Sequence, residues 1–187
     1  VLLHVLRHHR NMPYFLANQR AGIWDKPEVM HAGERRVGFL GLGIIAMPCA
    51  TLVHDVGFQV AAWTRNPKEV PGIENFHGAA GLEPFLAGCD IVINVLPLTQ
   101  ATENILSART FDMLPKGAAI INIGRGQHVV DEDLIASLDA GHLAAATLDV
   151  YRTEPLPTTH PFWAHPGITL MPHTARKSRP DHVAPQV

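Results

Sequence analysis

Short apolar runs alternate with helical patterns over most of this chain. The runs predicted to form strands are 37–40, 58–63, 91–96, 118–123, 143–150 and 167–171. Helices are predicted at 44–55, 82–87, 110–114 and 131–140. Such alternation is typical of an α/β fold, here a Rossmann-type doubly wound, mostly parallel sheet with helices on both faces. The runs IVINVL and AAIINI are apolar almost throughout, as expected for strands buried on both sides.

A helical amino-terminal segment precedes this alternation. Residues 1–10 are predicted to form a helix, and Pro13 can begin a second helical piece that ends near residue 20. Residues 21–34 carry glycine and proline and are expected to form a connecting arm. His4 and His8 have the i, i+4 spacing of a metal-binding pair. Because no third ligand is near them in the sequence, a solvated helix face is favoured over a metal site.

The segment RVGFLGLGIIAMPCA, at 36–50, combines a strand, a glycine turn and a helix. Gly41, Gly43 and Ala46 follow the pattern G-x-G-x-x-A. Gly41 allows the tight turn, Gly43 leaves room for a pyrophosphate, and Ala46 lets the helix pack close to the strand. The helix start, with Ile44 and Ile45, offers free N–H groups and a positive dipole end to the phosphates. Glycine-rich turns often bind nothing, but this context favours dinucleotide binding.

The end of the second predicted strand bears on which dinucleotide is bound. NAD-preferring folds usually place an acid there, about 20 residues past the glycines, to bind the ribose hydroxyls. Here Thr64 holds that position, followed by Arg65 and Lys68, and residues 59–68 contain no acid. A hydroxyl and a guanidinium suit a 2′-phosphate, so NADP(H) is preferred and NAD(H) remains possible. The alternative is a solvated loop with two chance cations.

Composition excludes several other classes of protein. The chain has 187 residues and a net charge of −2, with no basic run, so neither nucleic acid nor an anionic membrane is an expected partner. No apolar stretch approaches the ~20 residues of a membrane span. Cys49 and Cys89 lack metal-site spacing and are expected to be buried free thiols of a cytoplasmic protein.

The order of motifs along the chain carries a more specific resemblance. The glycine block alone is similar to β-hydroxyacid dehydrogenases of the hydroxyisobutyrate type, which continue into a helical domain with a catalytic lysine. This chain instead continues with INVLPLTQAT, then with LPKGAAIINIGRGQHVVDEDLIASLDAGHLAAATLDVYRTEPLP and LMPHTA. That succession resembles the D-isomer-specific 2-hydroxyacid dehydrogenases, and within them the glyoxylate/hydroxypyruvate reductases.

The resemblance implies a catalytic set of Arg125, Glu154 and His173. Arg125 would grip the carboxylate and carbonyl oxygen of a 2-oxo acid. His173 would give a proton to that carbonyl oxygen, and Glu154 would orient the imidazole and favour its protonated form. Taken singly, each residue has an ordinary alternative: a surface charge, a loop residue, or one of twelve histidines. Their order at the ends of predicted strands favours the family site.

Further site residues follow from the same resemblance. It implies that Asp149 lies near the nicotinamide carboxamide, that Leu96 and Pro97 lie under the adenosine, and that Ile123 belongs to the cofactor site. Trp163 could border the substrate pocket, although a packed core tryptophan is an equally good interpretation. The basic sequence TARKSRP after the last motif departs from the small apolar run expected there.

The implied function is NADPH-dependent reduction of glyoxylate or hydroxypyruvate by a homodimer that pairs partly through residues 1–24. Family members insert the cofactor domain into a substrate domain, so this chain is expected to be a fragment. Residues 1–35 would form a helical segment and arm for dimerisation, 36–175 the dinucleotide-binding domain, and 176–187 the start of a helix returning to the substrate domain. The alternative from another class is a nucleotide-binding, self-associating module without turnover.

Overall fold

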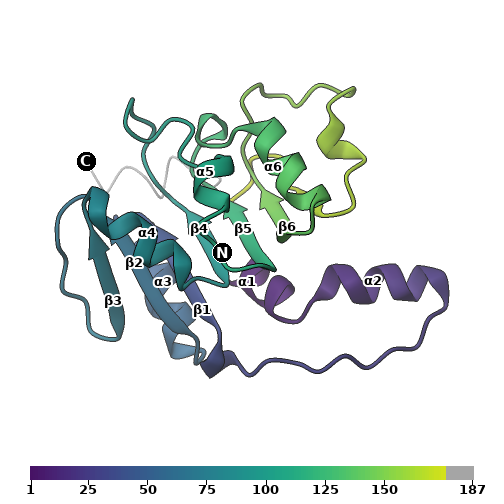
Figure 1. Ribbon diagram of the computed structural model, residues 1–187, viewed down its shortest axis with the longest axis horizontal. Helices are drawn as coiled ribbons and strands as arrows, with labels where there is room; N and C mark the ends of the chain where they lie inside the picture. Colours follow the sequence, from purple (N-terminus) through teal and green to yellow (C-terminus); the bar gives the residue numbers. More distant parts are fainter. Residues whose placement is uncertain (176–187) are drawn as a thin grey trace, which may run out of the picture.

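A computed structural model describes residues 1–175 of the chain. These residues fold around one parallel seven-stranded sheet (Figure 1). The strand order is β3-β2-β1-β4-β5-β6-β7, so the chain starts in the middle and winds outward to both edges. This confirms the predicted α/β class and the Rossmann-type winding. The strands are β1 (Arg36–Leu40), β2 (Gln59–Thr64), β3 (Ile73–His77), β4 (Ile91–Asn94), β5 (Ala118–Asn122), β6 (Leu143–Leu148) and β7 (Ile168–Leu170).

Six α-helices and four short 3₁₀ turns connect or flank these strands within the described residues. The helices are α1 (Leu2–His9), α2 (Met12–Ala21), α3 (Ala46–Asp55), α4 (Leu82–Ala87), α5 (Ala108–Phe111) and α6 (Asp131–Asp139). The 3₁₀ turns are η1 (Ala32–Glu34), η2 (Ala79–Gly81), η3 (Gly126–His128) and η4 (Pro161–Trp163). No helix among residues 1–175 is both long and apolar enough to cross a membrane.

The sheet separates two hydrophobic cores. Helices α1 and α3 cover one face, where Val53 of α3 is fully buried. Helices α4, α5 and α6 cover the other face, with Phe85 and Phe111 among its fully buried side chains. Cys89 is buried in this second core, whereas Cys49 is only partly buried; both are free thiols. Burial on both faces explains why the central strands are apolar almost throughout.

One row of paired residues crosses the sheet near the level where its strands end. Leu40 of β1 pairs with Trp63 of β2 on one side and with Asn94 of β4 on the other. The row continues through Asn122 of β5 and Leu148 of β6. Because the strands are parallel, the segments that follow this row leave the sheet along the same edge. Ligands of open α/β sheets bind at that carboxyl edge.

Strand β3 is missing from the sequence-based prediction. Its sequence, IENFH, has two apolar and three polar residues, so it lacks the continuous apolar run by which the central strands were predicted. As an edge of the sheet, β3 has only one neighbouring strand within the described residues. Helix α3 begins at Ala46, two residues later than predicted, since residues 41–45 form the glycine turn. The other predicted elements lie where expected, with ends that differ by a few residues.

The prediction that His4 and His8 lie on a solvated helix face is wrong for His8. Its side chain is buried, and its Nε2 lies 2.9 Å from Oγ1 of Thr147 on β6. Helix α1 therefore packs on the sheet, and Val5 on the same helix is fully buried. Within residues 1–175, no three His, Cys, Asp or Glu side chains gather closely enough to hold a metal ion.

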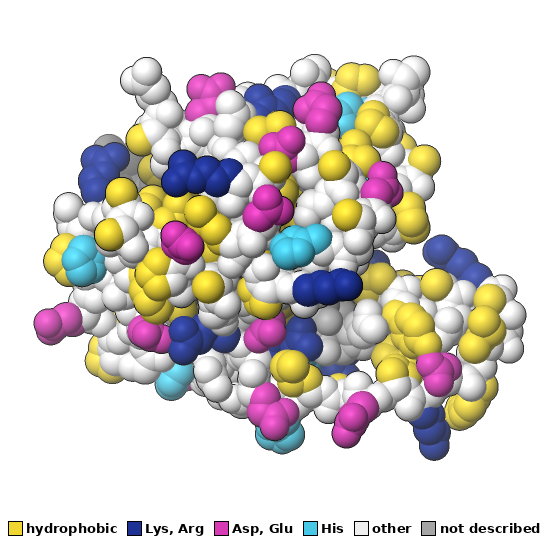
Figure 2. Space-filling view, viewed as in Figure 1, with side chains coloured by type: hydrophobic (Ala, Val, Ile, Leu, Met, Phe, Trp, Pro, Cys, Tyr) yellow, Lys and Arg dark blue, Asp and Glu magenta, His cyan; other side chains and the backbone are white. Residues whose placement is uncertain are grey.

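Helix α2 and the arm that follows it project from this body (Figure 1). Helix α2 has no buried residue, and residues 23–31 form an extended connection back to η1 and β1. Hydrophobic side chains are visible on this projecting part in Figure 2. The predicted helix start at 176–187 lies outside the described residues, and the predicted division into 1–35, 36–175 and 176–187 stays a prediction.

The burial of His8 predicts a pH-dependent loss of stability. Burial, together with the nearby charges of His4, Arg7 and Arg35, lowers the pKa of His8 to about 4 from its ordinary 6.5. The folded state thus holds His8 neutral, and the stability tied to that form is complete above pH 6.5 and is lost as the pH falls toward 4. The loss from this group should reach roughly 3 kcal/mol.

Urea unfolding between pH 7 and pH 4.5 measures this effect. The His8→Gln variant, which cannot titrate there, should lose less free energy of unfolding over this range than the unmutated chain. His77→Gln, at an exposed position on β3, is the matched control for losing one histidine. Parallel pH profiles for the unmutated chain and His8→Gln would contradict the prediction.

Candidate active site and cofactor groove

The glycine turn has the backbone geometry that its sequence predicts. Gly41 has φ of +96°, a region that side chains rarely adopt, and a Cβ there would lie 3.2 Å from Cδ2 of Leu96. Gly43 has nothing within 4 Å of the position where a Cβ would stand, so the space above it is open. Ala46 is buried at the start of α3, whose amino end carries no side-chain cap. The Met47 N–H bonds to the Gly43 carbonyl oxygen at 2.9 Å, which leaves the N–H groups of Ile44, Ile45 and Ala46 available to an anion.

This turn forms one wall of a groove of about 490 Å³ at the carboxyl edge of the sheet. The segments that follow β4 and β5 form the other walls. The lining residues are Gly43, Ile44, Ile45, Ala46, Val95, Leu96, Pro97, Leu98, Ile123, Gly124 and Arg125. Ile44 is 92% exposed, and such an apolar side chain can cover a flat ring. The structure thus brings predicted cofactor residues from three separate segments to one groove.

The predicted 2′-phosphate residues lie beside this groove but differ in availability. Thr64 is buried, and its hydroxyl donates to the Asn66 carbonyl oxygen at 2.7 Å, so it shapes the turn that carries the cations. Arg65 is exposed. Lys68 donates from Nζ to the carbonyl oxygen of Leu42 at 2.7 Å, which places its ammonium group directly against the glycine turn.

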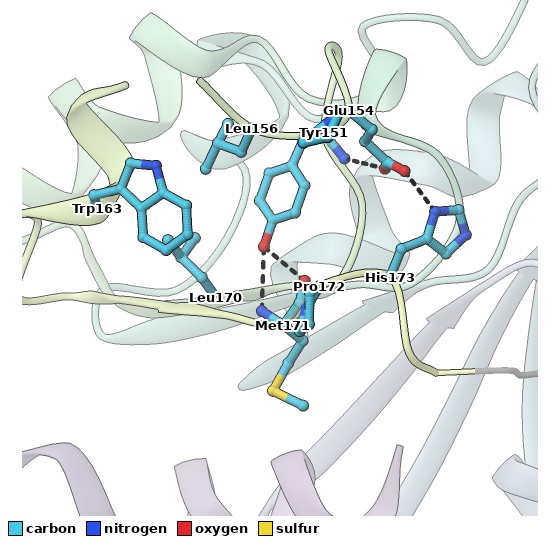
Figure 3. Close-up of a pocket in the computed structure, with 9 residues that line it drawn as sticks. Tyr151, Glu154, Leu156, Trp163, Leu170, Met171, Pro172 and His173 are labelled. Atoms are coloured by element: carbon cyan, nitrogen blue, oxygen red, sulfur yellow. Dashed lines mark hydrogen bonds and ion pairs between the residues drawn. The ribbon is translucent and has the colours of Figure 1, made fainter. Parts of the chain in front are cut away.

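His173 and Glu154 form a hydrogen-bonded pair at the same edge of the sheet (Figure 3). His173 Nδ1 lies 2.6 Å from Glu154 Oε2, and the other carboxylate oxygen accepts the backbone N–H of Tyr151 at 2.9 Å. The carboxylate is therefore held on both oxygens, and it fixes the ring so that Nε2 is left for a substrate. The resemblance implies that Glu154 orients the imidazole in this way, and the catalytic roles of both residues stay predictions.

Electrostatics favour an ionised Glu154. Partial burial alone would raise the pKa of its carboxyl group. The hydrogen bonds from His173 and from the Tyr151 amide, with the positive charges of His173 and Arg125, outweigh that effect and lower the pKa.

The loop that carries His173 has an unusual backbone held by specific bonds. His173 has φ of +52°, in the left-handed region. Both carboxylate oxygens of the buried Asp149 accept backbone N–H groups just beyond it, from Thr174 at 2.8 Å and Ala175 at 2.9 Å. Asp149 thus holds the His173 loop, a contact that the resemblance did not specify.

Arg125 leaves the sheet just past β5 and lines the groove. Its Nη1 donates to the Gly124 carbonyl oxygen at 2.7 Å. The next residue, Gly126, packs so tightly that a Cβ there would lie 1.8 Å from the carbonyl carbon of Tyr151. The Arg125 loop is thereby pressed against the main chain that leads to Glu154. The three predicted catalytic residues come from adjoining loops.

A second hollow, of about 600 Å³, lies next to His173 (Figure 3). It is lined by Tyr151, Glu154, Pro155, Leu156, Trp163, Leu170, Met171, Pro172 and His173. Trp163 is 56% exposed and donates from Nε1 to the Pro157 carbonyl oxygen at 2.9 Å. Of its two interpretations, the structure supports a wall of the hollow, not a packed core residue.

Sequence reasoning missed several polar residues that shape these segments. Asn94, Asn122 and His128 are completely buried and join the ends of β4 and β5 to the loop of Arg125. Asn75 on β3 bonds to Thr64 and to the backbone N–H of Lys68. A signal was present for the first two, since each is the lone polar residue in an otherwise apolar strand, at its carboxyl end.

The motif order and the site geometry agree with a comparison against protein families. Residues 2–175 match the family model for the NAD-binding domain of D-isomer specific 2-hydroxyacid dehydrogenases. The chain belongs to this family. The β-hydroxyacid dehydrogenase interpretation and a binding module without turnover are correspondingly disfavoured. Curated relatives include the glyoxylate/hydroxypyruvate reductases A of Yersinia enterocolitica, 40% identical over 187 residues, and of Serratia proteamaculans, 39% identical over 186 residues.

Solved structures of family members show the same architecture. A D-isomer specific 2-hydroxyacid dehydrogenase from Xanthobacter autotrophicus, in complex with NADPH and MES, is 44% identical, with a TM-score of 0.96 over all of this chain and 77% of that one. The NADPH-dependent glyoxylate/hydroxypyruvate reductase of Sinorhizobium meliloti, in complex with NADP and sulfate, is 33% identical, with a TM-score of 0.92 over 95% of this chain and 58% of that one. The chain spans about 60% of the length of the two curated relatives above, while they cover all of it.

Proposed function

We propose that the protein carrying this chain reduces a small 2-oxo acid, glyoxylate or hydroxypyruvate, to the 2-hydroxy acid with NADPH. The observation that supports this most is the 2.6 Å pair of His173 and Glu154 beside Arg125, at the edge of the sheet next to the cofactor groove. An imidazole oriented by a carboxylate, next to a guanidinium, is suited to protonate a carbonyl oxygen while the substrate carboxylate is held.

Each residue has a defined part in this reaction. Arg125 binds the carboxylate and the carbonyl oxygen of the oxo acid, which places the carbonyl carbon over the groove. His173 donates the proton from Nε2 to the carbonyl oxygen, and Glu154 stabilises the imidazolium before transfer. NADPH, when bound, supplies the hydride that reduces the carbonyl carbon. The hydroxyl hydrogen of the hydroxy acid then comes from His173.

The residues of the groove fit a phosphorylated dinucleotide. The open space above Gly43 and the free amino end of α3 suit a pyrophosphate. The exposed Arg65 and the ammonium group of Lys68 against the glycine turn supply positive charge for a 2′-phosphate. The cofactors in the Xanthobacter and Sinorhizobium structures, NADPH and NADP, are of this kind. Thr64 contributes by shaping the turn that presents these cations.

NADPH should bind more tightly than NADH. Arg65→Ala should reduce this preference by about 1–3 kcal/mol, because a charge-assisted contact to the 2′-phosphate is lost. Titration calorimetry with both cofactors measures the difference. Lys116→Ala, an exposed cation before β5 at the opposite edge of the sheet, should leave it unchanged. Equal affinities for the two cofactors in the unmutated protein would refute the assignment.

His173→Ala should lower turnover at least ~10²-fold while leaving NADPH binding nearly unchanged, since general acid catalysis contributes about 10²–10⁴-fold. Glu154→Gln should also lower turnover, by less than His173→Ala, because the carboxylate that orients the His173 ring is lost. Steady-state kinetics of glyoxylate reduction at pH 7 tests both. The exposed His54→Ala is the control; full activity in His173→Ala would mean that the proton donor lies elsewhere.

We further infer that the protein forms a homodimer partly through residues 1–24. This segment and its junction with the arm expose several large apolar side chains, namely Leu3, Leu6, Met12, Ile23 and Trp24. Trp24 alone is 89% exposed, and it follows α2 by three residues at the start of the arm. Apolar surface of this extent usually marks an interface, and soluble homo-oligomers most often form twofold pairs.

Light scattering at micromolar concentration should therefore give the mass of a dimer. The double variant Ile23→Asp, Trp24→Asp should shift the population to monomer, because charges would be buried without partners in the interface. Leu52→Asp, the same change at an exposed apolar residue of α3, should leave the dimer intact. A monomeric mass for the unmutated chain would rule the proposal out.

A further inference from the structure

A buried polar network lies beneath the proposed active site. Asn94, Asn122 and His128 are each 0% exposed, at the carboxyl ends of β4 and β5 and in η3. Burying an amide or an imidazole costs free energy unless its polar atoms find partners. The surrounding strands are otherwise apolar, so the presence of these three polar side chains requires an explanation.

The two asparagines hold the chain on both sides of the groove. Asn94 Oδ1 accepts the backbone N–H of Leu96 at 3.2 Å, which fixes the orientation of its amide. Its Nδ2 therefore donates, to Asn122 Oδ1 at 2.9 Å and toward His128 Nδ1 at 2.8 Å. Asn122 Nδ2 donates to the carbonyl oxygen of Arg125 at 3.0 Å.

These contacts determine the tautomer of His128. Its Nδ1 faces two donors, the Asn94 amide and the backbone N–H of Arg125 at 3.1 Å. Nδ1 must therefore be the unprotonated nitrogen, and the proton is on Nε2, which faces the carbonyl oxygen of Pro97 at 3.4 Å. Burial also lowers the pKa of His128, in agreement with a neutral ring.

The imidazole thus stands between two functional segments. On one side it holds the backbone N–H of Arg125, and on the other it faces Pro97, which lines the cofactor groove. Asn94 and His128 pack closely against Gly124: a Cβ on Gly124 would lie 2.9 Å from Asn94 Nδ2 and 3.0 Å from His128 Nδ1. This close packing leaves the His128 ring little room for another orientation. Movement of the ring would shift both segments.

We propose that His128 is a positioning residue that sets the place of Arg125 for the oxo acid and, through a separate ring nitrogen, the place of the Leu96–Pro97 segment for the cofactor. The inference rests on the proposed function. It adds that the two binding tasks are divided between Nδ1 and Nε2 of one buried ring. A purely structural role would not divide them.

Two substitutions separate these tasks. In His128→Asn, the amide oxygen can take the place of Nδ1 and accept from Arg125, but the side chain is too short to reach Pro97. In His128→Gln, the amide nitrogen can take the place of Nε2 and donate to Pro97, but nothing accepts at the Nδ1 position. His128→Ala removes both contacts.

Steady-state kinetics and NADPH titration should then give different results for His128→Asn and His128→Gln. For His128→Asn, we expect the NADPH dissociation constant to rise about 3–10-fold, the effect of one lost hydrogen bond, with little change in KM for glyoxylate. For His128→Gln, KM for glyoxylate should rise and kcat should fall by a similar factor, with little change in NADPH affinity. Equal effects of both variants on both constants, or none, would overturn the proposal. Thermal melting identifies any variant that fails to fold.

Nitrogen NMR of the imidazole in the unmutated chain provides a readout that needs no turnover. At pH 7, Nδ1 of His128 should show the shift of an unprotonated nitrogen and Nε2 that of an N–H, with and without NADPH. A protonated Nδ1 would overturn the proposal, because it could not accept from Arg125. If the unmutated protein binds NADPH but does not reduce glyoxylate, the proposed function fails, while the NMR result and the NADPH arm of the variants still decide the role of His128.

Discussion

The site depends on the register of the parallel sheet. The paired row that runs from Trp63 through Leu40, Asn94, Asn122 and Leu148 ends at Leu170 of β7. The glycine turn, the groove segments and the loops of the proposed catalytic residues all leave the sheet within a few positions of it. A one-residue slip of a strand would turn its buried side chains to the opposite face and misplace the segment that follows. Two packed hydrophobic cores make such a slip costly, so the cores determine where along the strands the site lies.

Features encoded in short stretches of sequence could be predicted. The glycine turn follows from the spacing of Gly41, Gly43 and Ala46, and the central strands follow from their apolar runs. Features that depend on distant partners could not. The partner of His8 is Thr147, separated by 139 positions, and no local pattern indicates that α1 packs on the sheet. The edge strand β3 has one neighbouring strand, so its sequence lacks the apolar run of a central strand.

The candidate site shows the same division in its chemistry. Motif order predicts a catalytic role for Arg125, Glu154 and His173, and the structure places the three residues on adjoining loops. The sequence could not predict the partner of the Thr64 hydroxyl. A hydroxyl at this position could bind a phosphate, but in the structure it donates to the carbonyl oxygen of Asn66. Asn94 and Asn122 were read as parts of apolar strands, although a lone amide at the end of a buried strand requires a partner. Polar residues inside apolar runs therefore indicate where a buried network supports a site.

The loop of His173 illustrates how such support offsets strain. A left-handed backbone at a residue with a side chain costs roughly 1–2 kcal/mol. The carboxylate of Asp149 accepts two backbone N–H groups directly after that residue, and hydrogen bonds to charged groups contribute about 1.5–3 kcal/mol each. The two bonds exceed the strain, so the unusual conformation is the stable one. An asparagine at 149 would offer one acceptor oxygen and could hold only one of the two amides. The requirement for an acid at this position thus follows from the backbone that aims the His173 ring at Glu154, and it would hold even if Asp149 never touched the cofactor.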